Sequence, residues 1–223
     1  MVSEKNIIIV CGHYGSGKTN FSINLALRER EKYEKVLLID MDIVNPYFRS
    51  SDYADVLDKK GIDIISPIYA GSTLDIPALS PRIDAAIGGG YQKVIIDAGG
   101  DDAGATALGR FSERIERAGY DMLYVANMYR PLVGTPEKGA EVLREIEAAS
   151  RLKATGIVNN SHLGEYTGAD TVRLSSDYIR ELSELVGLPV VCTAVKRDIA
   201  DECGPSVSGL YPIDIHVIPP WKE

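Results

Sequence analysis

The sequence IIIVC at residues 7–11 runs directly into GHYGSGKT at residues 12–19 and then into NFSINLAL at residues 20–27. An uncharged β-branched run, the pattern G-x-x-x-x-G-K-T and a segment of helical periodicity are typical of a strand, a phosphate-binding loop and a helix, in that order. The glycines let successive backbone N–H groups converge on a phosphate at the positive end of the helix. The stretch therefore predicts a nucleotide-binding P-loop.

Within this loop the residue types predict separate roles. Lys18 is expected to reach the β and γ phosphate oxygens, and the Thr19 hydroxyl is expected to take one ligand position of Mg²⁺. The other residues expected to contact the nucleotide are Gly12, His13, Tyr14, Gly15, Ser16, Gly17 and Asn20.

Length and composition favour a single α/β domain over residues 1–223. Of the 223 residues, 45% are hydrophobic and 25% charged, which is ordinary for a globular protein with a full core. No apolar run reaches the roughly 18 residues of a membrane helix. The N-terminal residues lead into a strand rather than a signal segment, and too few residues follow the last expected strand for a membrane-targeting helix. We expect a cytoplasmic protein.

Charge and cysteine usage argue against several classes of function. The net charge of −8 disfavours broad attachment to DNA, which depends on cationic surface. Cys11, Cys192 and Cys203 are far apart and form no C-x-x-C pair, so neither a closed zinc site nor a disulfide framework is indicated. Cys11 and Cys192 are expected to be small buried residues, and a metal ligand shared between two subunits is the alternative.

Acidic residues end two further apolar runs. The run at 36–39 leads into Asp40-Met41-Asp42, and the run at 93–96 leads into Asp97 and then Gly99-Gly100. The carboxyl ends of strands in an open parallel sheet lie where ligands bind, so these acids are expected near the phosphates. Asp97 is expected to hold Mg²⁺ through a water, and the glycine N–H to sense the γ-phosphate. For Asp40 or Asp42 the alternative is a turn or helix cap.

A pair of asparagines, Asn159-Asn160, follows the expected strand at 153–158. A carboxamide pairs bidentately with an adenine edge, so one of the two is a candidate base reader, and turn formation is the alternative role. Further strands are expected at 61–66, 121–126, 189–195 and 213–218. Helices are expected at about 75–90, 102–118 and 169–186, and another begins at TPE, residues 135–137. The alternation predicts an α/β fold with a mostly parallel central sheet of about seven or eight strands and helices on both faces.

Taken together, GHYGSGKT, DMD at 40–42 and DAGG at 97–100 resemble the CobQ/CobB/MinD/ParA family of P-loop nucleotide-binding proteins. That family belongs to a wider group with the nitrogenase iron protein and the nickel-inserting ATPase of carbon monoxide dehydrogenase maturation. The resemblance covers nearly the whole chain. The segment DIVNPYFR at 42–49 also resembles a clostridial-type group of ATP-binding proteins.

The resemblance implies a sandwich-like dimer with Mg-ATP at its interface. Asp42 matches the residue that positions the attacking water, and Asp40 the residue that supports Mg²⁺ and the switch loop. Asp97 matches the aspartate on the magnesium side, Gly100 the γ-phosphate sensor, and Asn159 the asparagine that reads adenine.

The P-loop departs from the family pattern at one position, which weakens the assignment of the family's mechanism to this chain. Many family members carry a lysine early in the loop that reaches the partner's phosphates, and here the corresponding residues 13–15 read HYG. Either another cation such as Arg49 or Arg130 replaces this lysine, or the dimer is weaker and hydrolysis slower.

The leading hypothesis is a slow Mg²⁺-dependent ATPase that dimerises with ATP, relaxes after hydrolysis and acts on an unidentified partner protein. Catalysis would rest on Lys18 and Mg²⁺ at the leaving oxygens and on Asp42, which orients water. One alternative is an ATP-dependent small-molecule kinase or amide ligase, with an acceptor pocket formed by Tyr69, Ser72, Thr73 and Arg82. The other is a metal-insertion ATPase, which needs cysteines or histidines that converge between subunits.

Overall fold

The computed structural model describes residues 2–41, 53–65, 76–99, 102–205 and 207–217. Their strands form one parallel sheet in the order β3-β2-β4-β1-β5-β6-β7-β8. The strands are β1 (Ile7–Cys11), β2 (Val36–Met41), β3 (Ile62–Ile65), β4 (Lys93–Ala98), β5 (Tyr120–Ala126), β6 (Gly156–Asn159), β7 (Val190–Lys196) and β8 (Leu210–Ile213). The α/β class with a sheet of about seven or eight strands is confirmed.

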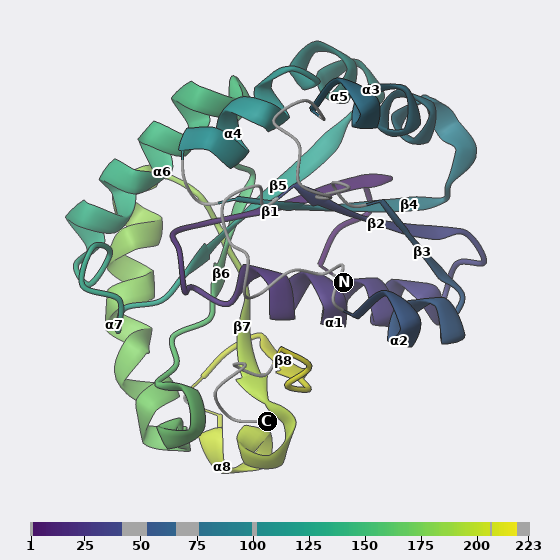
Figure 1. The fold of residues 1–223 in the computed structure, drawn as a ribbon. Helices are drawn as coiled ribbons and strands as arrows, with labels where there is room; N and C mark the ends of the chain where they lie inside the picture. The colour runs from purple at the N-terminus through teal and green to yellow at the C-terminus, as the bar shows by residue number, and fades with distance from the viewer. Residues whose placement is uncertain (1, 42–52, 66–75, 100–101, 206, 218–223) are drawn as a thin grey trace.

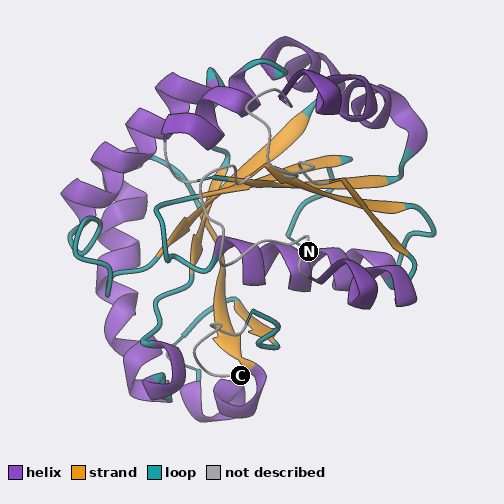
Figure 2. Cartoon of the chain, in the orientation of Figure 1, coloured by secondary structure: helices purple, strands orange, loops and turns teal. Residues whose placement is uncertain are grey.

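Helices cover both faces of this sheet (Figures 1 and 2). One face carries α1 (Lys18–Arg30) and α2 (Ala54–Lys59). The other carries α3 (Ile76–Ala85), α4 (Asp102–Gly109), α5 (Ser112–Ala118), α6 (Pro136–Ser150) and α7 (Ala169–Val186), while the short α8 (Ala200–Cys203) lies beside the end of β7. Single turns occupy Ala86–Gly90 after α3, Gly164–Tyr166 after β6 and Arg197–Ile199 after β7.

The two layers have separate hydrophobic cores. In β1, Ile7, Ile9 and Cys11 face the core under α4 to α7, whereas Ile8 and Val10 face the core under α1. All five residues are 2% exposed or less, since a parallel strand in the middle of such a sheet is covered on both sides. This burial on both faces explains why residues 7–11, directly before the P-loop, are all uncharged.

The strand order places the P-loop at the centre of one edge. β4 lies between β2 and β1, and β5 pairs with the other side of β1, so the direction of chain progression reverses beside β1. Ligands in open α/β sheets bind at such a reversal, outside the carboxyl ends of the strands. The loop at residues 12–17 connects β1 to α1 at this edge (Figure 1).

Two predicted elements differ from the structure. The helix expected at 102–118 is broken after Gly109, whose carbonyl accepts from Ser112 Oγ at 3.0 Å and from the Arg151 guanidinium instead of continuing the helix. The strand expected at 213–218 was wrong in position: β8 ends at Ile213, because the chain beyond it bonds to side chains of α1.

Candidate functional site

The two ends of the P-loop require glycine. Gly12 has a φ of 147° and Gly17 a φ of 85°. A Cβ at Gly12 would lie 2.3 Å from the Val125 carbonyl oxygen, and one at Gly17 would lie 2.3 Å from Asn160 Nδ2. Backbone angle and space therefore both exclude a side chain where the loop passes close to the ends of β5 and β6.

Lys18, the first residue of α1, folds back over the loop. Its side chain is buried, and Nζ donates to the His13 carbonyl at 3.3 Å, which also accepts from the Ser16 N–H at 3.1 Å. His13 Nδ1 lies 2.8 Å from the Tyr14 carbonyl oxygen, while the Tyr14 side chain is 56% exposed. The ammonium group thus lies within the loop that is predicted to hold phosphate.

Three side chains from the loops after β5 and β6 lie beside three consecutive P-loop residues. Arg130 Nε donates to the Gly15 carbonyl oxygen, and Asn160 Nδ2 donates to the Ser16 carbonyl oxygen, each at 2.7 Å. His162 Nε2 lies 3.2 Å from the position that a Cβ of Gly17 would take. We call Arg130, Asn160 and His162 the bracket, because together they hold the loop from one side.

Asn127, the residue after β5, ties the two bracket loops together. Its side chain is fully buried, Oδ1 accepts from the N–H groups of Tyr129 (3.0 Å) and His162 (3.2 Å), and Nδ2 donates to the His162 carbonyl (3.3 Å). Ser161 Oγ adds a bond from the Met128 N–H at 3.1 Å. The bracket is therefore one connected unit rather than three separate contacts.

Two buried carboxylates lie side by side on the α1 side of the sheet. Asp40 and Asp97 are register partners in β2 and β4, and each is 1% exposed. Asp97 Oδ1 accepts from Ser22 Oγ at 3.1 Å, and Ser22 lies one turn beyond Thr19 in α1. The structure thus brings the three predicted metal-binding residues to the same end of α1.

The two asparagines at the end of β6 point to opposite sides. Asn159 is 1% exposed, and its amide donates to Ser175 Oγ in α7 at 2.9 Å and accepts from the Ser161 N–H at 3.2 Å. Asn160 points the other way, onto the P-loop, as the alternation of side chains along a strand requires. The adenine-reading role matched to Asn159 stays a prediction, and Asn160 is the one of the pair at the P-loop.

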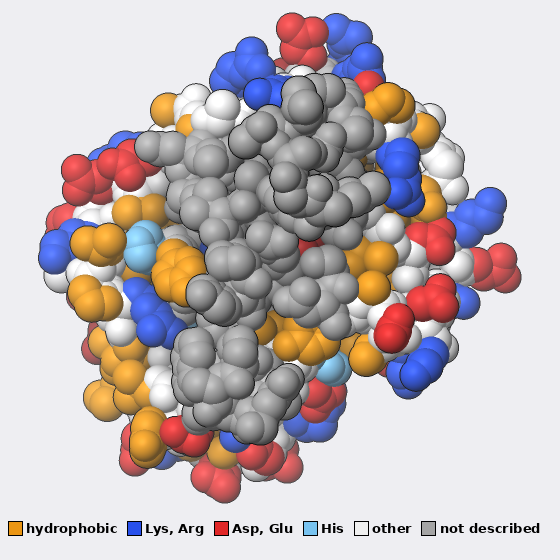
Figure 3. Space-filling view, viewed as in Figure 1, with side chains coloured by type: hydrophobic (Ala, Val, Ile, Leu, Met, Phe, Trp, Pro, Cys, Tyr) orange, Lys and Arg blue, Asp and Glu red, His pale blue; other side chains and the backbone are white. Residues whose placement is uncertain are grey.

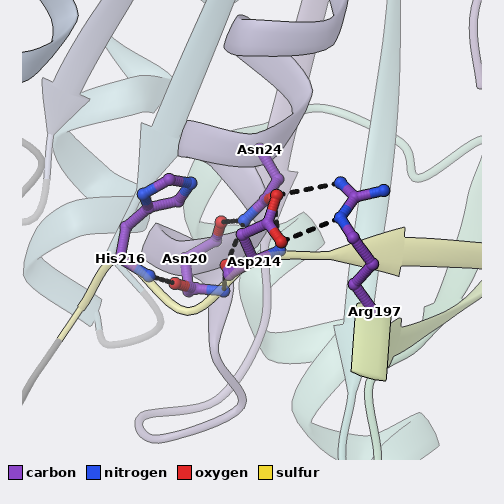
Figure 4. Close-up of polar contacts among 5 residues, drawn as sticks. All are labelled: Asn20, Asn24, Arg197, Asp214 and His216. Atoms are coloured by element: carbon purple, nitrogen blue, oxygen red, sulfur yellow. Dashed lines mark hydrogen bonds and ion pairs between the residues drawn. The ribbon is translucent and has the colours of Figure 1, made fainter. Parts of the chain in front are cut away.

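The side chain of Asn20 binds the chain beyond β8, which we call the strap (residues 214–217; Figure 4). Asn20 Oδ1 accepts from the N–H groups of His216 (2.8 Å) and Val217 (3.2 Å), and Nδ2 donates to the Asp214 carbonyl (3.0 Å). Asn24, one turn along α1, accepts from the Asp214 N–H and donates to its carbonyl, both at 2.8 Å. A contact between Asn20 and a nucleotide would therefore use its backbone N–H in the first helical turn.

The cysteines do not form a metal site in the described part of the chain. All three are buried, and burial raises the pKa of Cys11 and Cys192 to about 12. Within the described ranges no group of three or more His, Cys, Asp or Glu side chains could hold a metal ion. Several predicted residues lie outside these ranges: Asp42, Arg49, Tyr69, Ser72, Thr73 and Gly100.

Around the face that Figure 3 presents, acidic and basic side chains are intermixed. Hydrophobic side chains gather with a histidine and basic side chains at the left of this face, beside the bracket loops (Figures 1 and 3). Large exposed hydrophobic residues in the P-loop and in these loops are Tyr14, Leu132, Leu163 and Tyr166. No helix among the described residues is long and apolar enough to cross a membrane.

No protein-family model and no curated protein matches the chain, but solved structures share its fold. FtsY from Mycoplasma mycoides is 16% identical with a TM-score of 0.54, over 86% of this chain and 60% of that one. The signal recognition particle 54 kDa protein from Aeropyrum pernix, solved in complex with GDP, is 15% identical with a TM-score of 0.56, over 86% and 41%. FtsY from Thermotoga maritima is 18% identical with a TM-score of 0.54, over 86% and 62%.

The fold is that of a P-loop nucleoside triphosphatase. At these identities the likeness establishes the fold alone, and the present chain spans less than two thirds of the length of each of these neighbours. The CobQ/CobB/MinD/ParA resemblance agrees with the fold at this coarse level, and membership of that particular family stays a prediction.

Sequence reasoning missed three residues that shape the site: Asn127, Ser22 and His162. The first two act on residues 35 and 75 positions away, so they carry no local motif. The sequence did carry a signal for Asn127 and His162. Each follows an apolar run that predicts a strand, and the carboxyl ends of parallel strands meet at the same edge of the sheet.

Proposed function

We propose that this chain is a Mg²⁺-dependent ATP-binding switch that hydrolyses ATP slowly, dimerises when ATP is bound and acts on a partner protein. The observation that carries the proposal is a P-loop held by the bracket, with Lys18 inside it and the Asp40–Asp97 pair at the end of the same helix. Phosphoryl transfer requires a loop that binds the phosphates and, next to it, carboxylates that can hold a cation.

The donor set near the start of α1 fits Mg²⁺. The Thr19 hydroxyl and the carboxylates of Asp40 and Asp97 supply oxygen atoms, which magnesium prefers as ligands. A bound ion there would neutralise charge that develops on the phosphate oxygens. Ser22 orients Asp97 from α1, and Asp42, two residues beyond Asp40, is proposed to orient the attacking water.

Arg130 is the better candidate to replace the missing lysine. Its Nε donates to the Gly15 carbonyl, which lies in the part of the loop where relatives carry that lysine. Its terminal guanidinium nitrogens have no acceptor among the described residues, so they are free to neutralise phosphate charge. We propose that Arg130 acts within its own chain, and Arg130→Ala should lower ATP turnover while Arg110→Ala, at the exposed break between α4 and α5, leaves it unchanged.

The decisive experiment is solution mass by light scattering on the Asp42→Asn protein, without nucleotide, with Mg-ADP and with Mg-ATP. We expect this variant to bind ATP, to hydrolyse it poorly and to form a dimer with ATP alone. A monomer in every state, with ATP demonstrably bound, would contradict the dimer. Hydrolysis at the parent rate would remove Asp42 from the mechanism, and absence of ATP binding in the parent protein would overturn the proposal.

A further inference from the structure

His162 presents an aromatic nitrogen to the P-loop from a position that several contacts fix. Asn127 bonds both the N–H and the carbonyl of its backbone. Its ring Nδ1 accepts from the Gly164 N–H at 3.2 Å, and Nε2 lies 3.2 Å from the position of a Cβ at Gly17. The ring therefore cannot turn away from the loop without breaking the Gly164 contact.

The Gly164 contact also determines which ring nitrogen carries the proton. Because Nδ1 accepts a hydrogen bond, the neutral ring has its proton on Nε2, the nitrogen beside the P-loop. Burial and the neighbouring Arg130 guanidinium lower the pKa of His162 to about 4, so the ring is neutral at pH 7. No acceptor for the Nε2 proton is present among the described residues.

A neutral donor complements the two cations of this site. Lys18 and Arg130 attract phosphate by charge, but neither selects one oxygen, since both carry several donors. A single N–H with a locked direction adds orientation without adding charge. Its place beside Gly17, the residue before Lys18, puts this donor at the P-loop.

We propose that His162 is a nucleotide-contacting residue, whose Nε2–H donates to a phosphate or ribose oxygen of the nucleotide, and that Asn127 is its positioning residue. The inference rests on the proposed function, because it requires a nucleotide in the P-loop.

Calorimetric titration tests the contact and identifies the acceptor. The parent protein, His162→Leu, His162→Gln and the control Leu163→Ala are each titrated with Mg-ATP and with Mg-tripolyphosphate, which lacks ribose and base. We expect His162→Leu to weaken Mg-ATP binding about tenfold or more, the glutamine amide to restore part of it, and the exposed neighbour Leu163 to have no effect. A loss with both probes identifies a phosphate oxygen, and a loss with Mg-ATP alone places the acceptor on the nucleoside, as a contact to a ribose oxygen requires.

Imidazole nitrogen NMR gives a readout that a purely structural role would not change. The chain has only three histidines, so single substitutions assign every ring. We expect His162 to be the neutral Nε2-protonated form at pH 6, and its Nε2 resonance to shift when Mg-ATP is added. In Asn127→Asp, which keeps an oxygen acceptor but replaces the amide donor by a carboxylate oxygen facing the His162 carbonyl, we expect that shift to shrink along with affinity.

The outcomes separate this inference from the function on which it rests. Parent affinity in His162→Leu, together with an unmoved Nε2 resonance at saturating Mg-ATP, would overturn the contact and leave nucleotide binding intact. Failure of the parent to bind Mg-ATP would overturn both. Should His162→Leu not fold, the parent NMR titration and His162→Gln decide the question.

Discussion

At the scale of single residues, Gly17 shows how the absence of a side chain builds this site. It sits at the N-cap of α1 in the left-handed region, and its Cα faces Asn160 and His162 at distances that leave no room for a methyl group. The bracket can approach the loop this closely only because Gly17 has no side chain. The glycine pattern is therefore a requirement of both backbone angle and tertiary contact.

Replacing Gly17 by alanine should abolish most nucleotide binding. The new methyl group would displace Asn160, and the left-handed backbone adds strain of roughly 1–3 kcal/mol. Gly187→Ala is the matched control, since its φ of 69° is similar but nothing lies within 4 Å of its Cβ position. We expect Gly187→Ala to lose stability to urea and to keep its affinity for Mg-ATP, and equal affinities in both variants would contradict the steric argument.

His162 should also make stability depend on pH. Its folded pKa of about 4 lies below the ordinary value of 6.5, so the unfolded chain takes up the proton first. The free energy of unfolding therefore keeps its full value above pH 6.5 and decreases as the pH falls from 6.5 toward 4. Between pH 7 and pH 5 the loss is about 2 kcal/mol. Urea unfolding of His162→Gln should show a correspondingly flatter pH profile, and identical profiles in the two proteins would exclude this assignment.

At the scale of elements, α1 links the P-loop to the far end of the chain. Its first turn carries Lys18 and Thr19, its second turn presents Ser22 to Asp97, and Asn20 and Asn24 hold the strap. The two asparagines replace the partners that a further strand would give to residues 214–217. This explains why β8 ends at Ile213 although the sequence beyond it alternates like a strand.

The strap bonds should contribute measurably to stability. In Asn24→Ala the Asp214 N–H loses its partner and the Asp214 carbonyl keeps only its bond from Asn20, which should cost about 1–3 kcal/mol in urea unfolding. Arg197→Ala removes the bidentate ion pair with Asp214 instead, which is exposed on both sides, so we expect stability close to the parent. A loss in Arg197→Ala as large as the loss in Asn24→Ala would contradict this ranking, because the exposed ion pair would then stabilise the strap as much as the buried amide does.

Local patterns were sufficient for most elements and for the P-loop, but not for the bracket. The helix at 169–186 coincides with α7, and the acids at 40 and 97 lie one residue before the ends of neighbouring strands. The break after Gly109 and the placement of β8 depend on residues distant in sequence. The bracket likewise depends on the order of β1, β5 and β6 in the sheet, which periodicity alone does not specify.

At the scale of the whole molecule, loops from β1, β5 and β6 and the acids of β2 and β4 meet at one edge of a sheet that is buried on both faces. A ligand at this edge would contact segments more than a hundred residues apart, such as Gly15 and Arg130. Such a site is assembled only in the folded chain, so ligand binding must stabilise the fold as a whole.

Thermal unfolding with different nucleotides should therefore report both binding and base preference. At about one hundred times the dissociation constant, a ligand adds about 2.7 kcal/mol to the unfolding free energy, which raises Tm by roughly 5–10 °C in a domain of this size. We expect this shift with Mg-ATP, a smaller shift with Mg-GTP at the same concentration, and none in Lys18→Ala. The GDP in the Aeropyrum pernix neighbour makes guanine the relevant competitor. A shift with Mg-GTP that equals or exceeds the shift with Mg-ATP would contradict the choice of adenine, while leaving the P-loop and its bracket as the binding site.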